Sequence, residues 1–333
     1  MQIVINTYGS YIRKRGECFE IKIDEQKKEI SARKVQSILI TTSALISTDA
    51  ILLAHENNVD IIFLDKYGNP FSRVWHSKFG STAFIRRKQL EFSENKEGFE
   101  MVKTWILEKI ENQIGLLEKL EKTREEKREK IEEYVTAISK IRDKLALIGG
   151  GTIGKLRKRV FSLEAGCGKI YLRAVKFIIP ERYKFSGRSQ HPAKDEFNAF
   201  LNYGYGILYS KVERACILAG LDPYIGFLHT DRYGKKSFVY DVVELFRIHV
   251  DEIVIKLFSK RMVKQDMFRK IQNGLMLEKE GKQVLISEFN KSMEETMRYR
   301  GRNIKKTNIM EFECHRIANG LIGKDKDVSL GDI

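Results

Sequence analysis

Two kinds of hydrophobic pattern divide the chain near residue 83. In the first part, short runs rich in β-branched and aromatic residues alternate with turn-like segments, which favours strands. These runs are 3–6, 18–23, 28–34, 36–42, 59–65 and 70–76. One stretch in this part, residues 47–57, has helical spacing instead, with Ser47 or Thr48 as its N-cap. The pattern predicts a small β-rich domain over residues 1–83.

From residue 84 onward, apolar residues recur at the spacing of helices. Residues 99–144 combine strong helix formers with opposite charges four positions apart, so we expect an exposed helical hairpin without chemistry of its own. The glycines at 149–151 match no phosphate-binding loop motif and indicate a break before a helix capped by Thr152. Further helices are expected through Glu164, after residue 195, and at 287–299 and 306–321, with a hairpin near 280–281. The chain is therefore predicted to be α+β, with an all-α catalytic domain at 84–325 and a mobile tail at 326–333.

The segment from residue 226 to 247 holds the densest candidate chemistry. His229 follows a short apolar run and precedes a basic, glycine-containing turn, and the apolar residues from Phe238 onward predict a helix. Asp241 and Glu244 are three positions apart, so a helix would place both carboxylates on one face, with Arg247 one step further along. Neighbouring carboxylates repel unless a proton or cation lies between them, and carboxylates with an imidazole suit Mg²⁺ or Mn²⁺. The pattern equally allows two surface ion pairs and a turn histidine.

Glu164 is a further candidate metal ligand, on a helix that also contains Gly166 and Gly168. Glycines weaken a helix interior by about 1 kcal/mol each relative to alanine, so they suggest close approach of another element or of DNA. The alternative is that Glu164 only pairs with a nearby lysine.

The formal net charge of +15 is concentrated after residue 85. Between residues 155 and 188 there are ten basic side chains and two acidic ones, a balance that fits binding to a phosphate backbone. Tyrosines among such charges can stack on unpaired bases, although core packing is their more common use. The candidate DNA contacts are Arg247, Lys158, Arg173, Arg188 and Tyr203.

Other classes of protein are disfavoured by what the sequence contains. No run of 18 or more apolar residues occurs and the first residues lack the order of a signal peptide, so we expect a cytoplasmic protein that does not bind membranes. The four cysteines lack zinc-finger spacing and are expected to be unpaired. Cys167, close to Glu164, is expected to be a buried thiol rather than a nucleophile.

Four stretches together resemble the family of CRISPR-associated endonucleases and integrases called Cas1. They are EAGCGKIYL at 164–172, DEFNAFLNYGYGILY at 195–209, AGLDPYIGFLH at 219–229 and SFVYDVVELFR at 237–247. The resemblance implies that Glu164, His229 and Glu244 are metal ligands for Mg²⁺ or Mn²⁺, and that Asp241 assists them as a fourth catalytic residue.

The same resemblance implies a biological role and partners. A homodimer formed through the β-rich domains would act with a small partner, Cas2, to insert new spacer DNA into a CRISPR array. The 3′-hydroxyl of the captured DNA would attack a phosphodiester of the repeat, and water in its place would give the nuclease reaction. A DNA-binding scaffold without catalysis and a related transposon integrase are the alternatives.

Overall fold

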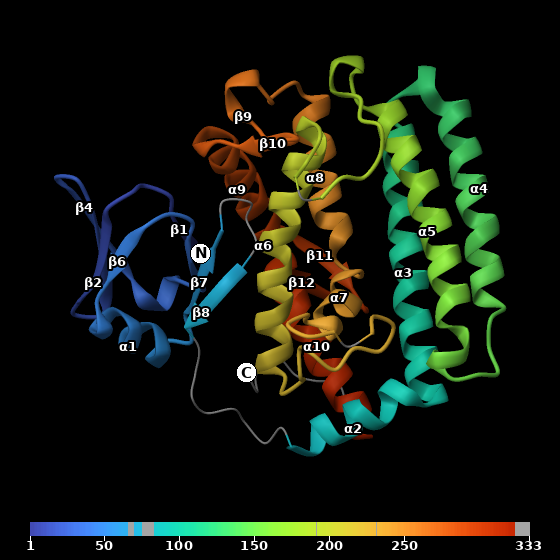
Figure 1. Ribbon diagram of the computed structural model, residues 1–333, viewed down its shortest axis with the longest axis horizontal. Coiled ribbons are helices and arrows are strands. Elements are labelled where there is room, and N and C mark those ends of the chain that lie inside the picture. Colours follow the sequence, from blue (N-terminus) through green and yellow to red (C-terminus); the bar gives the residue numbers. More distant parts are fainter. Residues whose placement is uncertain (66–69, 75–82, 191, 231, 324–333) are drawn as a thin grey trace.

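The computed structural model describes residues 1–65, 70–74, 83–190, 192–230 and 232–323. A β-rich part and a larger, mainly helical part lie side by side (Figure 1). The tail expected at 326–333 lies outside the described residues. No helix in the described ranges is long and apolar enough to cross a membrane.

The β-rich part consists of two sheets and one helix. The order of the first sheet is β1-β5-β7-β8, with β8 antiparallel to its neighbour and the other pairs parallel. Its strands are β1 Gln2–Ile5, β5 Ser37–Ile40, β7 Asp60–Leu64 and β8 Pro70–Val74. The second sheet has the order β4-β3-β2-β6, from β4 Gln26–Ser31, β3 Cys18–Ile23, β2 Ser10–Arg15 and β6 Ala44–Ile46. Buried aliphatic residues of both sheets and of helix α1 form one core, including Ile12, Ile38, Leu53 and Ile61.

Most local expectations for this part are confirmed. The six predicted runs all contain strands, and α1 Thr48–Glu56 begins after Ser47, whose hydroxyl accepts a hydrogen bond from the Ala50 N–H at 3.2 Å. Strands β2 and β6 were not predicted. β2 contains three basic residues in six, and β6, although apolar, is only three residues long, so neither stands out as a strand pattern.

Three long helices lie next to one another along one side of the helical part, and α6 lies between them and the β-rich part (Figure 1). The helices are α2 Ala83–Glu94, α3 Lys96–Glu121, α4 Arg128–Ala146, α5 Ile153–Ile178, α6 Glu196–Leu218, α7 Ser237–Val243, α8 Arg247–Ser259, α9 Lys279–Met293 and α10 Lys306–Leu321. Short 3₁₀ turns occur at Ala32–Lys34, Glu125–Lys127, Glu181–Tyr183 and Gln265–Met267. The two helices of the predicted hairpin are confirmed as α3 and α4, and the last predicted helix as α10, but the expectation that the hairpin is exposed was wrong, because one face of α3 is buried.

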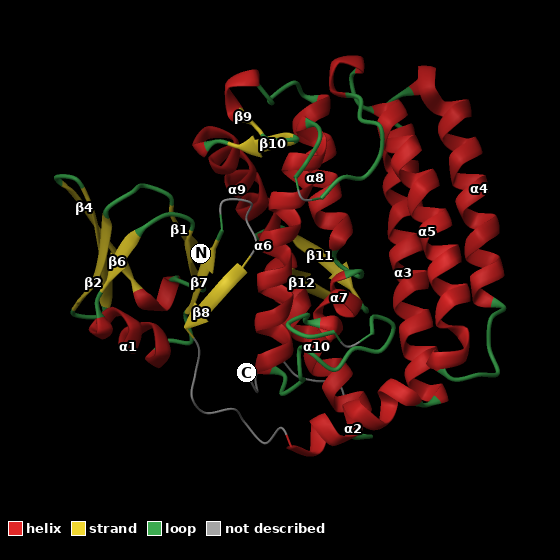
Figure 2. Ribbon diagram, in the orientation of Figure 1, coloured by secondary structure: helices red, strands yellow, loops and turns green. Residues whose placement is uncertain are grey.

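The expectation that the second part is all-α was wrong. It contains two antiparallel hairpins, β9 Phe268–Ile271 with β10 Gly274–Leu277, and β11 Thr296–Tyr299 with β12 Arg302–Lys305 (Figure 2). Both turn through residues with positive φ, Asn273 in the first and Arg300 and Gly301 in the second. The hairpin expected near 280–281 falls within α9, because the turn at Asn273 comes several residues earlier. Four-residue strands are too short for a period of two to be distinguished.

Arg73 of β8 connects the two parts through buried polar contacts. Its guanidinium lies 3.2 Å from the Asp60 carboxylate on β7, and it donates a hydrogen bond of 2.7 Å to the Ser210 carbonyl on α6. The same guanidinium lies 3.5 Å from Glu213, which also pairs with Lys236 at 2.7 Å. Because α6 also lines the cavity described below, these contacts fix the β-rich part relative to that cavity.

His249 on α8 provides a pH-dependent test of the packing in the helical part. Burial, reinforced by nearby Lys306 and opposed by Glu252 and Glu295, lowers its pKa from 6.5 to about 4. A histidine whose folded-state pKa is depressed stabilises the fold above its unfolded pKa and loses that contribution as the pH falls toward the folded pKa. We expect His249→Gln to remove about 3 kcal/mol of pH-dependent stability between pH 7 and pH 4.

The measurement is urea unfolding of both proteins across that pH range. The difference between the two free energies of unfolding isolates His249, since other titrating groups contribute equally to both. Two curves that run parallel from pH 7 to pH 4 would contradict the prediction.

Candidate active site

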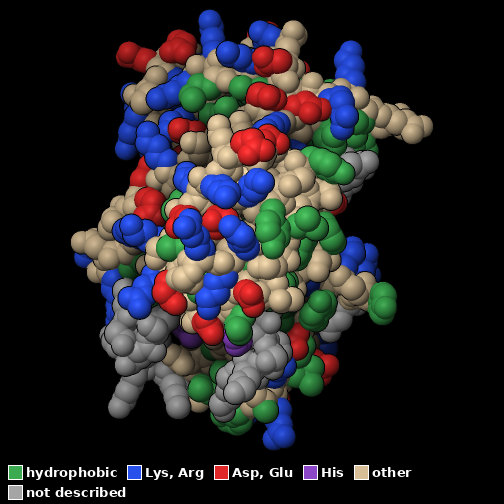
Figure 3. All heavy atoms as spheres, turned by 90° about the vertical axis from the view of Figure 1, so that its left-hand side faces the viewer, with side chains coloured by type: hydrophobic (Ala, Val, Ile, Leu, Met, Phe, Trp, Pro, Cys, Tyr) green, Lys and Arg blue, Asp and Glu red, His purple; other side chains and the backbone are tan. Residues whose placement is uncertain are grey.

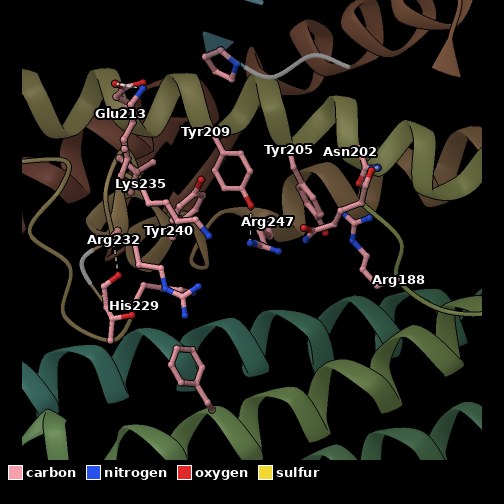
Figure 4. A pocket seen from close by; sticks show the side chains of 18 residues that line it. Arg188, Asn202, Tyr205, Tyr209, Glu213, His229, Arg232, Lys235, Tyr240 and Arg247 are labelled. Atoms are coloured by element: carbon pink, nitrogen blue, oxygen red, sulfur yellow. Dashed lines mark hydrogen bonds and ion pairs between the residues drawn. The ribbon is translucent and has the colours of Figure 1, made fainter. Parts of the chain in front are cut away.

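An open cavity of about 640 Å³ lies between α6, the loop that follows residue 228, and the junction of α7 with α8. Figure 4 shows Asn202, Tyr205 and Tyr209 pointing into it from α6, with His229 toward one end. Its other charged lining residues are Arg188, Glu213, Arg232, Lys235, Lys236 and Arg247. The cavity is therefore cationic and aromatic, which suits an anionic polymer.

Glu244 is directed inward by a helix break that the sequence pattern did not predict. The expected continuous helix ends at Val243 and a new one begins at Arg247, so Glu244 occupies a tight turn between α7 and α8. Its side chain is buried, and its two oxygens lie 2.6 Å from Lys109 Nζ and 2.9 Å from Arg247 Nη2. Burial raises the pKa of Glu244, but the charges of Arg247 and Lys109 lower it by more. The net shift is downward, so the carboxylate stays charged.

Lys109 of α3 joins Glu244 to the second candidate acid, Glu164 of α5. Its ammonium donates a hydrogen bond to Glu164 and forms an ion pair with Glu244. Burial lowers the pKa of Lys109, while Glu244 and Glu164 raise it by more, so the net shift is upward and the ammonium is charged. The two acids that the sequence placed in a metal site thus converge on one cation.

Asp241 is buried and hydrogen-bonded to the loop that carries His229. Its carboxylate accepts hydrogen bonds from the backbone N–H groups of Phe227 at 2.6 Å, Leu228 at 3.1 Å and His229 at 3.0 Å. It also lies 2.7 Å from His229 Nδ1, and it is only 2% exposed. Both oxygens are used inside the protein and Asp241 is not among the residues that line the cavity, so we interpret Asp241 as a residue that positions His229.

These contacts orient His229 toward the cavity. A carboxylate only accepts hydrogen bonds, so Nδ1 carries the hydrogen and Nε2 is left available to act as a ligand or a base. The ring packs edge-on against Phe161 of α5 at 5.4 Å between centroids. Gly226 is required for the same loop, because a Cβ there would lie 2.4 Å from the His229 carbonyl oxygen.

The donor set fits a divalent cation in its chemistry. Two carboxylates already hold the positive charge of the Lys109 ammonium between them, and carboxylate oxygens are ligands that Mg²⁺ and Mn²⁺ prefer. His229 adds a nitrogen donor whose orientation is fixed by a carboxylate, as is usual for metal-binding histidines. Among the described residues, however, no three acidic, histidine or cysteine side chains lie close enough to hold one ion together. The structure joins Glu164 with Glu244 and leaves His229 outside that pair.

Two arginines and two tyrosines form a stack along the cavity beside Glu244. The Arg247 guanidinium lies 4.9 Å from the ring centroid of Tyr205 and donates a hydrogen bond of 2.7 Å to the Tyr209 hydroxyl. Arg188 lies 5.4 Å from the same Tyr205 ring, and Figure 4 shows the two arginines flanking that ring. Tyr205 is held from behind by a hydrogen bond to the buried Asp251. The stack orders two guanidinium groups beside the cavity, and guanidinium is a side-chain group well suited to pairing with phosphate.

The remaining predicted DNA contacts lie elsewhere. Lys158 and Arg173 are exposed on α5 and are not among the residues that line the cavity. Tyr203 was expected to stack on bases, but it is 2% exposed, with the Lys282 ammonium 5.7 Å from its ring centroid. That expectation was wrong, because residues 203 and 205 point in different directions on one helix. Tyr203 packs in the core, whereas Tyr205 reaches the cavity.

Lys109 is the functional residue that the sequence reasoning missed. The charge pattern predicts an exposed hairpin here, yet Lys109 lies in the apolar stripe of α3 that includes Val102, Ile106 and Ile110. A lysine at a core-facing position of an amphipathic helix is unusual unless it is paired. The core-facing position of Lys109 in the sequence pattern therefore indicates a buried, paired cation.

The site thus combines a cationic, aromatic cavity with paired carboxylates and an oriented histidine. A family model described as "CRISPR associated protein Cas1" matches residues 3–291. A CRISPR-associated endonuclease Cas1 of Archaeoglobus fulgidus is 32% identical over 97% of both chains, and one of Saccharolobus solfataricus is 28% identical over 95% of this chain and 92% of the relative. The chain therefore belongs to the Cas1 family.

Solved structures show the same fold at lower sequence identity. A casposase bound to an integration product has a TM-score of 0.83 and 21% identity, covering 100% of this chain and 95% of the casposase. A Cas1 protein of Thermotoga maritima has a TM-score of 0.80 and 18% identity over 99% of both chains. A Cas6-RT-Cas1–Cas2 complex has a TM-score of 0.80 and 18% identity, covering 97% of this chain and 35% of the matched chain.

Proposed function

We propose that this protein is a metal-dependent DNA integrase and endonuclease of CRISPR adaptation. Its reaction would be the attack of a DNA 3′-hydroxyl on a phosphodiester of the repeat. The observation that carries the proposal is the cation-bridged pair of Glu164 and Glu244 next to a histidine and a cavity lined by arginines. Membership of the Cas1 family supports this role.

The chain's own residues account for binding and orientation in this reaction. Arg188 and Arg247, ordered against Tyr205, would hold the phosphates on either side of the reacting bond without selecting a sequence. Asp241 keeps the His229 Nε2 directed into the cavity. Glu164, Glu244 and His229 would hold Mg²⁺ or Mn²⁺, which when bound supplies Lewis-acid stabilisation of charge on the reacting oxygens.

Strand transfer by this route breaks one phosphodiester and forms another. The 3′-oxygen bonds to phosphorus and loses its proton, and the displaced 3′-oxygen of the repeat strand gains one, so no external energy source is consumed. Water in place of the 3′-hydroxyl would give hydrolysis at the same phosphorus. One site therefore accounts for both the integrase and the endonuclease reactions.

The proposed assembly is a homodimer that acts on DNA together with Cas2. Figure 3 shows the face of the β-rich part, where charges of both signs are interspersed and apolar side chains gather toward one side. Tyr8, Leu45 and Phe71 of this part are 80%, 67% and 71% exposed, and a protein contact here could bury them. The occurrence of a Cas1–Cas2 complex among proteins of the same fold supports the Cas2 partner.

The test is joining of a short DNA duplex to a supercoiled plasmid that carries a CRISPR repeat, with the full chain and its Cas2 partner. We expect covalent joining with Mn²⁺ or Mg²⁺ and none with EDTA. A duplex with 3′-dideoxy ends is the matched control and should not be joined, because it lacks the attacking oxygen.

Binding measured on the same samples separates the alternatives. Tight, salt-sensitive DNA binding without joining under any metal condition would contradict the proposed reaction and favour a non-catalytic scaffold. Joining that is efficient on plasmids without a repeat and with a transposon end as donor would favour a transposon integrase.

A further inference from the structure

The position of Lys109 has a consequence for how a metal ion can enter this site. The Lys109 ammonium lies between Glu164 and Glu244, with 10% of the lysine side chain exposed, and it is bound to both acids. A divalent cation held by the same two carboxylates would need the same space. Two cations that close together in a buried site would repel strongly, so they cannot both remain.

We infer that Lys109 is a resident cation that keeps the carboxylate pair charged and assembled without metal, and that metal binds by displacing it. This inference rests on the proposed metal dependence. Lys109 would then have two effects. It stabilises the carboxylate pair when no metal is bound, and it lowers the affinity of the site for metal because it competes for the same two carboxylates.

The two carboxylates would respond differently to withdrawal of Lys109. The other oxygen of Glu244 remains 2.9 Å from Arg247, which itself is held by Tyr209. Glu244 therefore keeps its orientation when the ammonium leaves. Glu164 has Lys109 as its ion-pair partner and is more exposed, at 22% of its side chain, so it is the ligand free to turn toward an incoming ion.

A polar acceptor for the displaced ammonium lies one helical turn away. Gln113 occupies position i+4 from Lys109 on α3, and helical side chains four apart are neighbours. Helical side chains lean toward the N-terminus, which places the Gln113 amide over the turn that carries Lys109. The Gln113 Oε1 atom is buried and makes no hydrogen bond with any described residue. Withdrawal of Lys109 toward Gln113 would satisfy that oxygen and open the space between the two acids.

The experiment measures Mn²⁺ binding to the full chain without DNA, by electron paramagnetic resonance of free Mn²⁺ and by calorimetry. Lys109→Met removes the ammonium and keeps an apolar stem of similar length. We expect its Mn²⁺ affinity to rise about tenfold or more over that of the wild type, since a competing cation is removed. Lys119→Met, also on α3 and paired with Glu252 away from the site, is the matched control and should leave the affinity unchanged.

Thermal unfolding gives a second readout. Without metal, Lys109→Met should unfold at a lower temperature than the wild type, because the two carboxylates repel, and saturating Mn²⁺ should restore more stability to the variant than to the wild type. Lys109→Gln retains hydrogen-bond donors but has no charge, so its unfolding temperature and its stabilisation by Mn²⁺ should change in the same direction as those of Lys109→Met. It also provides the test if the methionine variant does not fold.

The outcomes distinguish this inference from the proposed function. Wild-type protein that binds Mn²⁺, with folded Lys109 variants that bind it no more tightly, would overturn the inference and leave metal dependence standing. Absence of Mn²⁺ binding in the wild type and in every variant would overturn both.

Discussion

Glu244→Gln is expected to reduce DNA joining on the order of a hundred- to a thousandfold, the usual cost of losing one group that stabilises charge in a transition state. Glutamine keeps the size of the side chain but removes the charge that Lys109 and Arg247 hold in place. In the proposed reaction the same carboxylate is a metal ligand, so its loss affects both orientation and charge. Joining measured under single-turnover conditions with saturating DNA isolates this effect from DNA binding.

Glu252→Gln is the matched control for this substitution. Glu252 is a carboxylate on α8, one helix further along, and it also pairs with a lysine of α3, Lys119. Its replacement should leave joining within about threefold of the wild type, as expected for a surface ion pair. Equal losses in both variants, or full activity in Glu244→Gln, would show that Glu244 does not take part in the reaction.

Asp241→Ala is expected to destabilise the fold by about 3 kcal/mol or more and to abolish joining. The substitution leaves three backbone N–H groups without an acceptor, two of them buried, and each buried group costs about 1–3 kcal/mol. It also frees His229 to adopt other orientations, since its Nδ1 loses its partner. The free energy of unfolding from urea titration, together with joining below the transition temperature, measures both effects.

The comparison for Asp241 is Asp222→Ala. Asp222 also accepts a backbone hydrogen bond, from the Tyr224 N–H at 2.9 Å, but in a more exposed turn. It should lose about 1 kcal/mol and retain joining. If Asp241→Ala were as stable as Asp222→Ala and still inactive, Asp241 would act directly in the reaction, and its assignment as a positioning residue would be wrong.

The hydrogen bonds of Asp241 also connect helix α7 to the loop that carries His229. Residues 227 and 228 lie beside residue 241, because their backbone N–H groups donate hydrogen bonds to the buried Asp241 carboxylate. Gly226 permits the close approach at the start of the loop, and Ser237 closes it by donating to the Thr230 carbonyl at 2.9 Å. The histidine is therefore positioned by the interior of the protein and not by the basic turn that follows it.

Much of this protein follows from its sequence alone. Alternating and helical hydrophobic spacing identified the β-rich part, the α3–α4 hairpin and α10. Each of these elements buries one face against a core, so apolar residues recur along its sequence at the period of that face. The motifs carrying Glu164, His229, Asp241 and Glu244 identified the family. Local chemistry was sufficient for such features as the Ser47 cap, whose partner is three residues away.

Only the tertiary structure decided which of these residues act together. The break at Glu244 depends on packing and on the pairing of its carboxylate with Lys109, 135 positions earlier in the chain, and spacing along one helix cannot show such a contact. Helical spacing predicts Asp241 on the same face as Glu244. In the structure Asp241 is buried instead, where it accepts hydrogen bonds from the backbone N–H groups of Phe227 and His229. Lys109 became the centre of the site because Glu164 of α5 and Glu244 of the α7–α8 turn both pair with it, and in a low-dielectric interior a charge is tolerated only where opposite charges converge.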